Sequence, residues 1–146
     1  MIRVVLTCLL TVAIAGVAFP AVDAARADAT TVTIGTMADD IAHAAASLAA
    51  TEDPPPAGLA GARRHVVLDV PSGSWRATGV SRLTVHGGDG VELAATTASG
   101  TTIVRRVGGP RVHVVGERLV LGPGEHRLRL TLAANTAGPV VVVAPA

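Results

Sequence analysis

Aromatic residues are almost missing from this sequence. It has no tyrosine, one phenylalanine (Phe19) and one tryptophan (Trp75). A folded core must therefore be built from Val, Leu and Ala. We interpret Trp75 as the one large core anchor, with an exposed binding residue as the alternative. Since single-stranded nucleic acids are held largely by stacking on aromatic side chains, the scarcity of such residues also speaks against a nucleic-acid partner.

Cysteine is nearly absent as well. The single cysteine, Cys8, lies inside an apolar run, so the sequence has no intramolecular disulfide and no CxxC metal or redox motif. A lipidated cysteine needs a longer apolar run before it than the few residues that precede Cys8.

The sequence also has no large excess of charge of one sign. The formal net charge is +1, and all twelve basic residues are arginine. Nucleic acids and anionic membrane patches are attracted by clustered positive charge, which this sequence does not have. We therefore expect no nucleic-acid partner.

The sequence does have a long apolar opening. Residues 4–22 carry no charge, and as a helix this run of about 19 residues would span ~28 Å, close to the hydrocarbon thickness of a bilayer. Two interpretations fit: a retained transmembrane helix, or a signal peptide cut near small residues such as Ala25-Arg26-Ala27.

The residues that follow favour retention, because they continue a helical pattern. Apolar residues recur at steps of three and four, which predicts an amphipathic helix that packs on the domain behind it, with a contact to a partner helix or a filament as the alternative; they are Ile34, Met37, Ile41, Ala45 and Leu48. Gly35 and the preceding Thr30–Thr33 run are expected to weaken or break this helix, and Pro20 to kink the membrane segment.

The positive-inside rule gives an orientation. Arg3 and the amino terminus lie before the apolar run and Arg26 lies after it, which favours a cytoplasmic N-terminus and an external C-terminal part. The partner of the first segment is then membrane lipid, and the location is the cell membrane.

A proline run marks the main boundary. Pro54-Pro55-Pro56 ends the helical pattern, since successive prolines favour an extended, stiff spacer. We therefore divide the chain into a transmembrane or signal segment (1–23), an amphipathic helical stalk (24–50), a Pro-rich linker (51–60) and a β-rich domain (61–146).

After the boundary the pattern has a period of two. Alternation at 66–70, 82–86 and 127–132 predicts half-buried strands, and the apolar run Val140–Val143 predicts a final strand covered on both faces, whose removal would expose a sheet edge. Turns are predicted at the clusters Pro71–Gly73, Gly87–Gly90, Gly108–Pro110, Gly122–Gly124 and Asn135–Pro139. The fold class is α+β: an N-terminal membrane helix continuing into an amphipathic helix, followed by a small antiparallel sheet or sandwich.

No motif marks a catalytic, cofactor or metal site. The histidine pairings with carboxylates do not have zinc-ligand spacing; they are His65 with Asp69, His113 with Glu117, and His126 with Glu125. Ser74 is not in a G-x-S-x-G elbow, and Gly87–Gly90 has no P-loop Lys-Ser/Thr. We expect no enzyme, no cofactor and no metal.

Two arginine doublets, Arg63-Arg64 and Arg105-Arg106, are the only adjacent basic pairs. Neighbouring strand residues point to opposite faces, so one arginine of each doublet is available for an ion pair or a partner contact. Most such arginines simply lie on a solvated face.

The stretch "VAIAGVAFPAVDAARAD" and the helical stripe after it resemble type IV pilins and pseudopilins in architecture. These proteins also have a membrane helix, a proline near its end, an amphipathic continuation and a β-domain. The resemblance covers the first third of the chain, and it implies assembly with protein partners of a pilus-like or secretion apparatus.

The stretch "EDPPPAGLAGARRHVVLDVP", with the N-terminal run, is similar to an uncharacterised family of short membrane-anchored proteins of halophilic archaea. This similarity implies no catalytic or binding residue. The sequence predicts a single-pass anchored protein whose external β-domain serves assembly or interaction; a cleaved, secreted β-sheet binding domain is the alternative.

Overall fold

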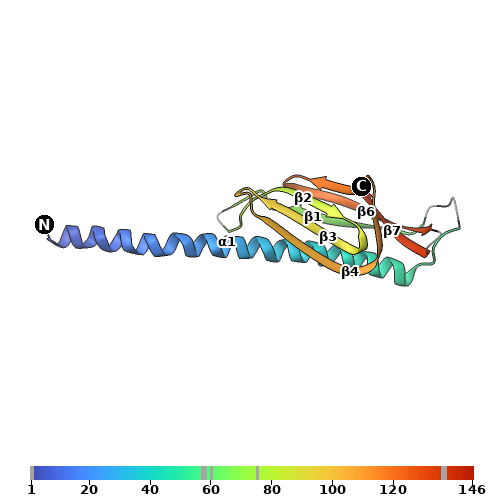
Figure 1. Cartoon of the computed structure of the whole chain (residues 1–146), viewed down its shortest axis with the longest axis horizontal. Coiled ribbons are helices and arrows are strands. Elements are labelled where there is room, and N and C mark those ends of the chain that lie inside the picture. Colours follow the sequence, from blue (N-terminus) through green and yellow to red (C-terminus); the bar gives the residue numbers. More distant parts are fainter. Residues whose placement is uncertain (1, 57–58, 60, 75, 136–137) are drawn as a thin grey trace.

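One long helix and one sheet make up the protein in the computed structural model, which describes residues 2–56, 59, 61–74, 76–135 and 138–146. The helix, α1, runs without a break from Ile2 to Thr51. Its second half underlies the sheet, and its first half extends beyond the sheet domain (Figure 1). The predicted α+β class, with an N-terminal apolar helix before a mostly antiparallel sheet, is confirmed.

The predicted break of the helix near Gly35 is wrong, because α1 continues through this position. The threonines before Gly35 keep their backbone helical, and the hydroxyls of Thr30, Thr31 and Thr33 each donate to the carbonyl four residues earlier, at 2.9 Å. The helix also continues through Pro20. Tertiary packing of the second half outweighs the low helix propensity of these residues.

The sheet has seven strands in the order β1-β6-β7-β4-β3-β2-β5. Their bounds are Arg63–Val70 (β1), Val80–His86 (β2), Gly88–Thr97 (β3), Thr102–Val114 (β4), Arg118–Leu121 (β5), Gly124–Asn135 (β6) and Gly138–Pro145 (β7). All neighbouring strands are antiparallel except β4 and β7, which pair in parallel over Val112–Val114. The predicted strands lie within β1, β2, β6 and β7.

The predicted turn at Gly108–Pro110 is wrong, because β4 runs through these residues. Asp89 of β3 pairs with Arg111, and the next residue, Gly90, pairs with Gly108, so Gly109 and Pro110 have no partner in β3. They form a bulge, where the missing N–H of proline is tolerated. The predicted hairpin at Gly87–Gly90 is present, but only Gly87 lies between the strands.

The final strand lies in the middle of the sheet and not at its edge. β7 pairs with β6 along its whole length and with β4 near its end. Val141 and Val143 are fully buried, whereas Val140 and Val142 on the other face are half-buried. The predicted consequence of losing this strand, an exposed sheet edge, agrees with this position: its loss would expose the edges of both β6 and β4 and divide the sheet into two parts.

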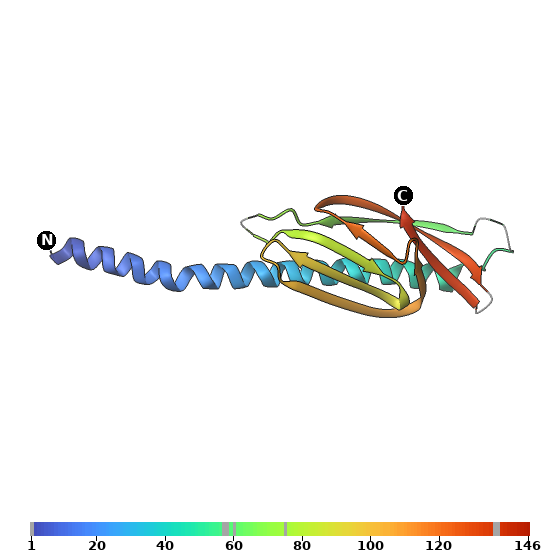
Figure 2. The same cartoon turned by 45° about the horizontal axis from the view of Figure 1, so that its top comes forward.

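One hydrophobic core joins the helix to the sheet. It contains aliphatic residues of α1 and of all seven strands. The sheet curls around the second half of α1 (Figure 2), so that the inner faces of its strands share this core. The helical residues predicted as an apolar stripe, from Ile34 to Leu48, are buried in it.

Candidate functional site: a membrane anchor and its junction

The first half of α1 is an apolar rod without protein contacts to cover it. Its large hydrophobic side chains are exposed; Leu9, Ile14 and Phe19 have exposed fractions of 63%, 61% and 71%. In the described part of the chain, α1 is the one helix long and apolar enough to cross a membrane, with a mean hydropathy of 2.3 in its most apolar window and none of that window buried. A signal sequence has the same properties.

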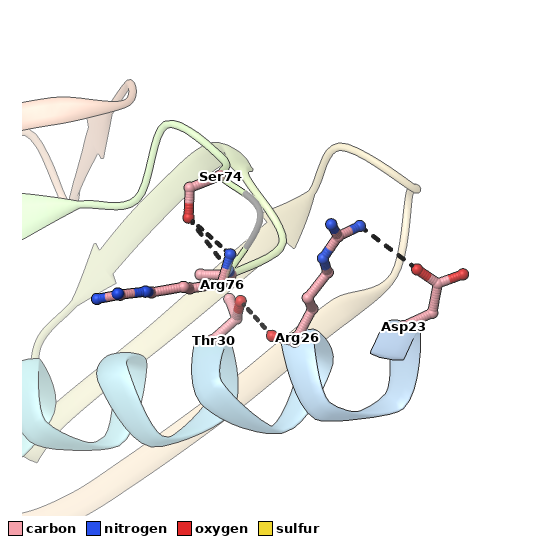
Figure 3. A network of polar contacts seen from close by, with 6 residues as sticks. Asp23, Arg26, Thr30, Ser74 and Arg76 are labelled. Atoms are coloured by element: carbon pink, nitrogen blue, oxygen red, sulfur yellow. Dashed lines mark hydrogen bonds and ion pairs between the residues drawn. The ribbon is translucent and has the colours of Figure 1, made fainter. Parts of the chain in front are cut away.

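Charged side chains begin where the apolar run ends. Asp23 follows Val22 directly, and its carboxylate lies 3.6 Å from the Arg26 guanidinium, one turn further along the helix. Figure 3 shows this ion pair on the side of α1 that faces the loop carrying Ser74 and Arg76. Such a pair at the surface contributes little to stability. It does mark the end of the segment that can lie in hydrocarbon.

The domain first contacts the helix at Arg26 and Thr30. The Thr78 N–H donates to the Arg26 carbonyl at 3.5 Å. The Thr30 hydroxyl lies 3.0 Å from the Thr78 carbonyl and 2.9 Å from the Arg26 carbonyl, and it can donate to either. Thr30 is fully buried. The loop between β1 and β2 is thereby fixed to the helix, two turns beyond the apolar run.

The β1–β2 loop is itself held in shape by hydrogen bonds. The Ser74 hydroxyl accepts from the N–H groups of Arg76 and Ala77, at 3.1 and 3.2 Å (Figure 3). The Ser74 N–H donates to the Ala77 carbonyl at 2.9 Å. The loop is thus a closed turn that carries Thr78 to the helix. Trp75 lies outside the described residues, so its assignment as a core anchor or binding residue stays a prediction.

A groove runs between the helix and β4 beside Gly35. It has a volume of about 410 Å³ and is lined by Thr31, Val32, Gly35, Thr36 and Asp39 of α1 and Ile103, Val104 and Arg105 of β4. A Cβ at Gly35 would lie 4.0 Å from the Arg105 guanidinium nitrogen Nε. Sequence reasoning treated Gly35 only as a weak point of the helix. In the structure Gly35 lines the groove beside Arg105, and a Cβ there would only reach ordinary van der Waals contact with that side chain.

The histidines do not converge. His65 is on the exposed face of β1, His113 is exposed in β4, and His126 contacts the Gly122 carbonyl at 2.8 Å. Glu117, considered above as a pair with His113, lies in the turn after β4 with a φ of 69°. Within the described ranges no three His, Cys, Asp or Glu residues are close enough together to hold a metal ion.

One arginine of each doublet has a side-chain partner within the chain. Arg64 reaches the helix, where its guanidinium donates to the Ser47 hydroxyl at 3.0 Å. Arg106 forms an ion pair with Glu92 of the neighbouring strand, its Nε donating to Glu92 Oε2 at 2.7 Å. Two of the four arginines therefore have structural partners within the chain.

A second hollow, of about 440 Å³, lies on the outer face of the sheet near the β3–β4 bulge. Its side chains include Asp89, Arg111, His113 and Val142. The hollow brings together a carboxylate (Asp89), a guanidinium (Arg111) and the apolar side chain of Val142. These groups form no pattern specific to one ligand. The sequence placed them in separate turns and strands, and only the register of β3, β4 and β7 unites them.

Of the three comparisons with known proteins, one found a match. No curated protein matches the chain, and no solved structure matches it either. A family model described as a domain of unknown function matches residues 1–146, the whole length of the chain. The match agrees with the predicted similarity to an uncharacterised family. The protein therefore belongs to the family described as domain of unknown function DUF7311.

Proposed function

We propose that this protein is a single-pass membrane protein whose first helical half stays in the bilayer and whose sheet domain is held outside the cell for assembly or interaction. The observation that carries the proposal is the continuity of α1. The same helix that carries the uncharged, exposed run of residues 4–22 becomes buried in the domain from Thr30 onward. An aqueous environment would leave this apolar rod uncovered, whereas lipid covers it.

The assembly role is supported by the difference between the two halves of α1. One half protrudes and is apolar, and the other half is buried under a mostly antiparallel sheet. This is the arrangement that the resemblance to type IV pilins implies. We propose that the protein is an accessory of a pilus-like or secretion apparatus, with neighbouring subunits or apparatus proteins as partners. The role requires no catalysis by this chain.

A cleaved, secreted β-domain is the second candidate, and one observation favours it. The buried residues of α1 begin at Thr30, so a cut after Ala27 would leave the whole core intact. Such a cut would remove the Arg26 carbonyl that accepts from Thr78. The two candidates therefore differ in whether residues 1–27 persist in the mature protein.

The anchor is tested by placing two carboxylates in the exposed half of the helix. We expect Leu10→Asp with Ile14→Asp to release the protein from the carbonate-resistant membrane fraction, because each Asp at a helix centre opposes insertion by about 2.5–3.5 kcal/mol. The matched control is Val32→Asp with Thr36→Asp, which has the same spacing on the same helix and also replaces exposed residues. It should stay in the membrane. Equal extraction of both variants would contradict the proposal.

The assembly role is tested separately, by crosslinking in intact cells. Photo-crosslinking residues at exposed Val104 and Val120 should yield specific adducts of defined mass. A probe at fully buried Leu93 is the control and should yield none. Absence of adducts from all exposed positions would contradict a role in assembly while leaving the anchor untouched.

A further inference from the structure

We infer that the described residues of the β1–β2 loop, 71–74 and 76–79, rest on the lipid headgroups of the bilayer, so that the sheet domain sits directly on the membrane surface. The inference rests on the proposed anchoring of α1. It adds a second contact with lipid, made by a loop far from α1 in the sequence. The lipid partner is the zwitterionic or anionic headgroup layer, and not the hydrocarbon interior.

The helix sets the height of this loop. If Val22 lies at the hydrocarbon boundary, Arg26 lies about 6 Å and Thr30 about 12 Å above it, at ~1.5 Å per residue. The headgroup layer of one leaflet is roughly 5–7 Å thick, from the difference between the total and the hydrocarbon thickness. Thr78, bonded to both helix residues, is therefore held at the outer margin of the headgroup layer.

The domain cannot swing away from this position, because nothing between the membrane and the first contact acts as a hinge. Residues 21–34 contain no glycine or proline, and they are helical throughout. The helix then enters the core at Ile34, which is fully buried. A rigid rod that begins in lipid and ends in the core fixes the distance between domain and bilayer.

The loop is also the part of the domain that faces the membrane. Figure 1 shows the β1–β2 connection and the β3–β4 turn together at the end of the sheet next to the exposed half of α1. The two are tied by the Ala98 N–H, which donates to the Gly79 carbonyl at 2.8 Å. Ser72, Gly73 and Ser74 are exposed there. Their small polar side chains and backbone can hydrogen-bond to headgroup phosphates and bound water without disturbing the fold.

Backbone contacts hold the two arms of the loop together. The Val80 N–H donates to the Pro71 carbonyl at 2.8 Å and closes the base of the loop. Gly73 and Gly79 approach so closely that a Cβ on Gly79 would lie 3.1 Å from Gly73. Side chains at these two glycines would force the two arms of the loop apart.

The test measures depth with single-cysteine variants in nanodiscs that contain a lipid with a nitroxide on its headgroup. Cys8 is replaced by serine, and a bimane fluorophore is attached at Ser72→Cys in the loop. Val22→Cys marks the boundary. The control, Glu52→Cys, is exposed and lies beyond the far end of α1. We expect quenching at position 72 comparable to that at 22 and several-fold greater than at 52.

A second variant tests whether the length of the helix between the bilayer and the domain sets the height of the loop. Seven helix-forming polar residues inserted between Asp23 and Ala24 would raise the domain by ~10 Å and rotate it by only about 20°. Quenching at position 72 should then fall to the level at 52, while quenching at 22 stays unchanged.

The outcomes separate this inference from the anchor. Strong quenching at 22 with none at 72 would overturn the seating of the loop and leave the anchor in place. Absence of quenching at 22 would overturn the anchor, and the inference with it. Quenching at 72 that persists after the insertion would also overturn the inference, because loop depth would not depend on helix length.

Discussion

The hydroxyl of Thr30 lies 3.0 Å from the carbonyl oxygen of Thr78, and it joins the middle of α1 to the loop between β1 and β2. Thr30 is fully buried, and it lies at the point where the helix passes from exposed apolar residues to the domain core. Figure 3 shows the hydroxyl between the helix and the loop. The contact adds to the shared hydrophobic core, and it fixes the β1–β2 loop against the helix.

Replacing Thr30 with valine tests this junction. The substitution keeps the shape but leaves the Thr78 carbonyl without the hydroxyl, and we expect a loss of about 1–3 kcal/mol in the free energy of unfolding. Thr31→Val is the control: Thr31 is exposed and its hydroxyl bonds only within the helix, so its effect should be within about 0.5 kcal/mol. Denaturant unfolding of the full chain in detergent measures both. Equal effects would contradict the role of Thr30.

The two halves of α1 should respond differently to the same truncation. Ile41 is fully buried in the core, and Ile41→Ala should lower the free energy of unfolding by about 2–5 kcal/mol. Ile14, with 61% of its surface exposed, is the matched control. Ile14→Ala should leave the unfolding of the domain unchanged. A comparable loss from Ile14→Ala would show that the first half of the helix packs on protein.

The bulge between β3 and β4 requires a glycine at position 90. Gly90 has a φ of +120°, and a Cβ there would lie 2.2 Å from the Val107 carbonyl oxygen. Backbone strain alone makes Gly90→Ala unfavourable by roughly 1–3 kcal/mol, and the clash adds to this. Gly109→Ala, in the same bulge, meets no atom within 4 Å and should be tolerated. Thermal unfolding compares the two, and similar melting temperatures would contradict the bulge geometry.

Deletion of residues 138–146 should abolish folding of the domain. It removes β7, which separates β6 from β4 and contributes two fully buried valines. Deletion of Ala146 alone removes one hydrogen bond, from its N–H to the Arg127 carbonyl, and should cost about 1 kcal/mol. Circular dichroism and proteolysis distinguish the outcomes. A folded, protease-resistant product from the longer deletion would show that β7 is dispensable.

The fold class and the buried helical stripe could be predicted because both depend on local periodicity. Apolar residues from Ile34 to Leu48 recur with a period near 3.6, and those in β1 and β6 with a period of two. Burial follows directly from such patterns. The Gly35 prediction failed because propensity is a local preference, and the contacts of the helix with the sheet override it.

The sheet order and the bulge could not be predicted from local sequence. Gly108-Gly109-Pro110 has the composition of a turn, and only the register with β3 makes it a bulge. The parallel pairing of β7 with β4 depends on contacts between strands far apart in the chain. The same is true of the junction, since Thr30 and Thr78 are separated by 48 positions and neither belongs to a motif.

The most direct test of the central claim is the intact mass of the native protein recovered from carbonate-washed membranes of its own cells. If the first half of α1 stays in the bilayer, the recovered chain is membrane-bound and retains residues 2–27, the apolar helix included. A soluble product in the medium that begins near Ala25 or Asp28 would contradict it.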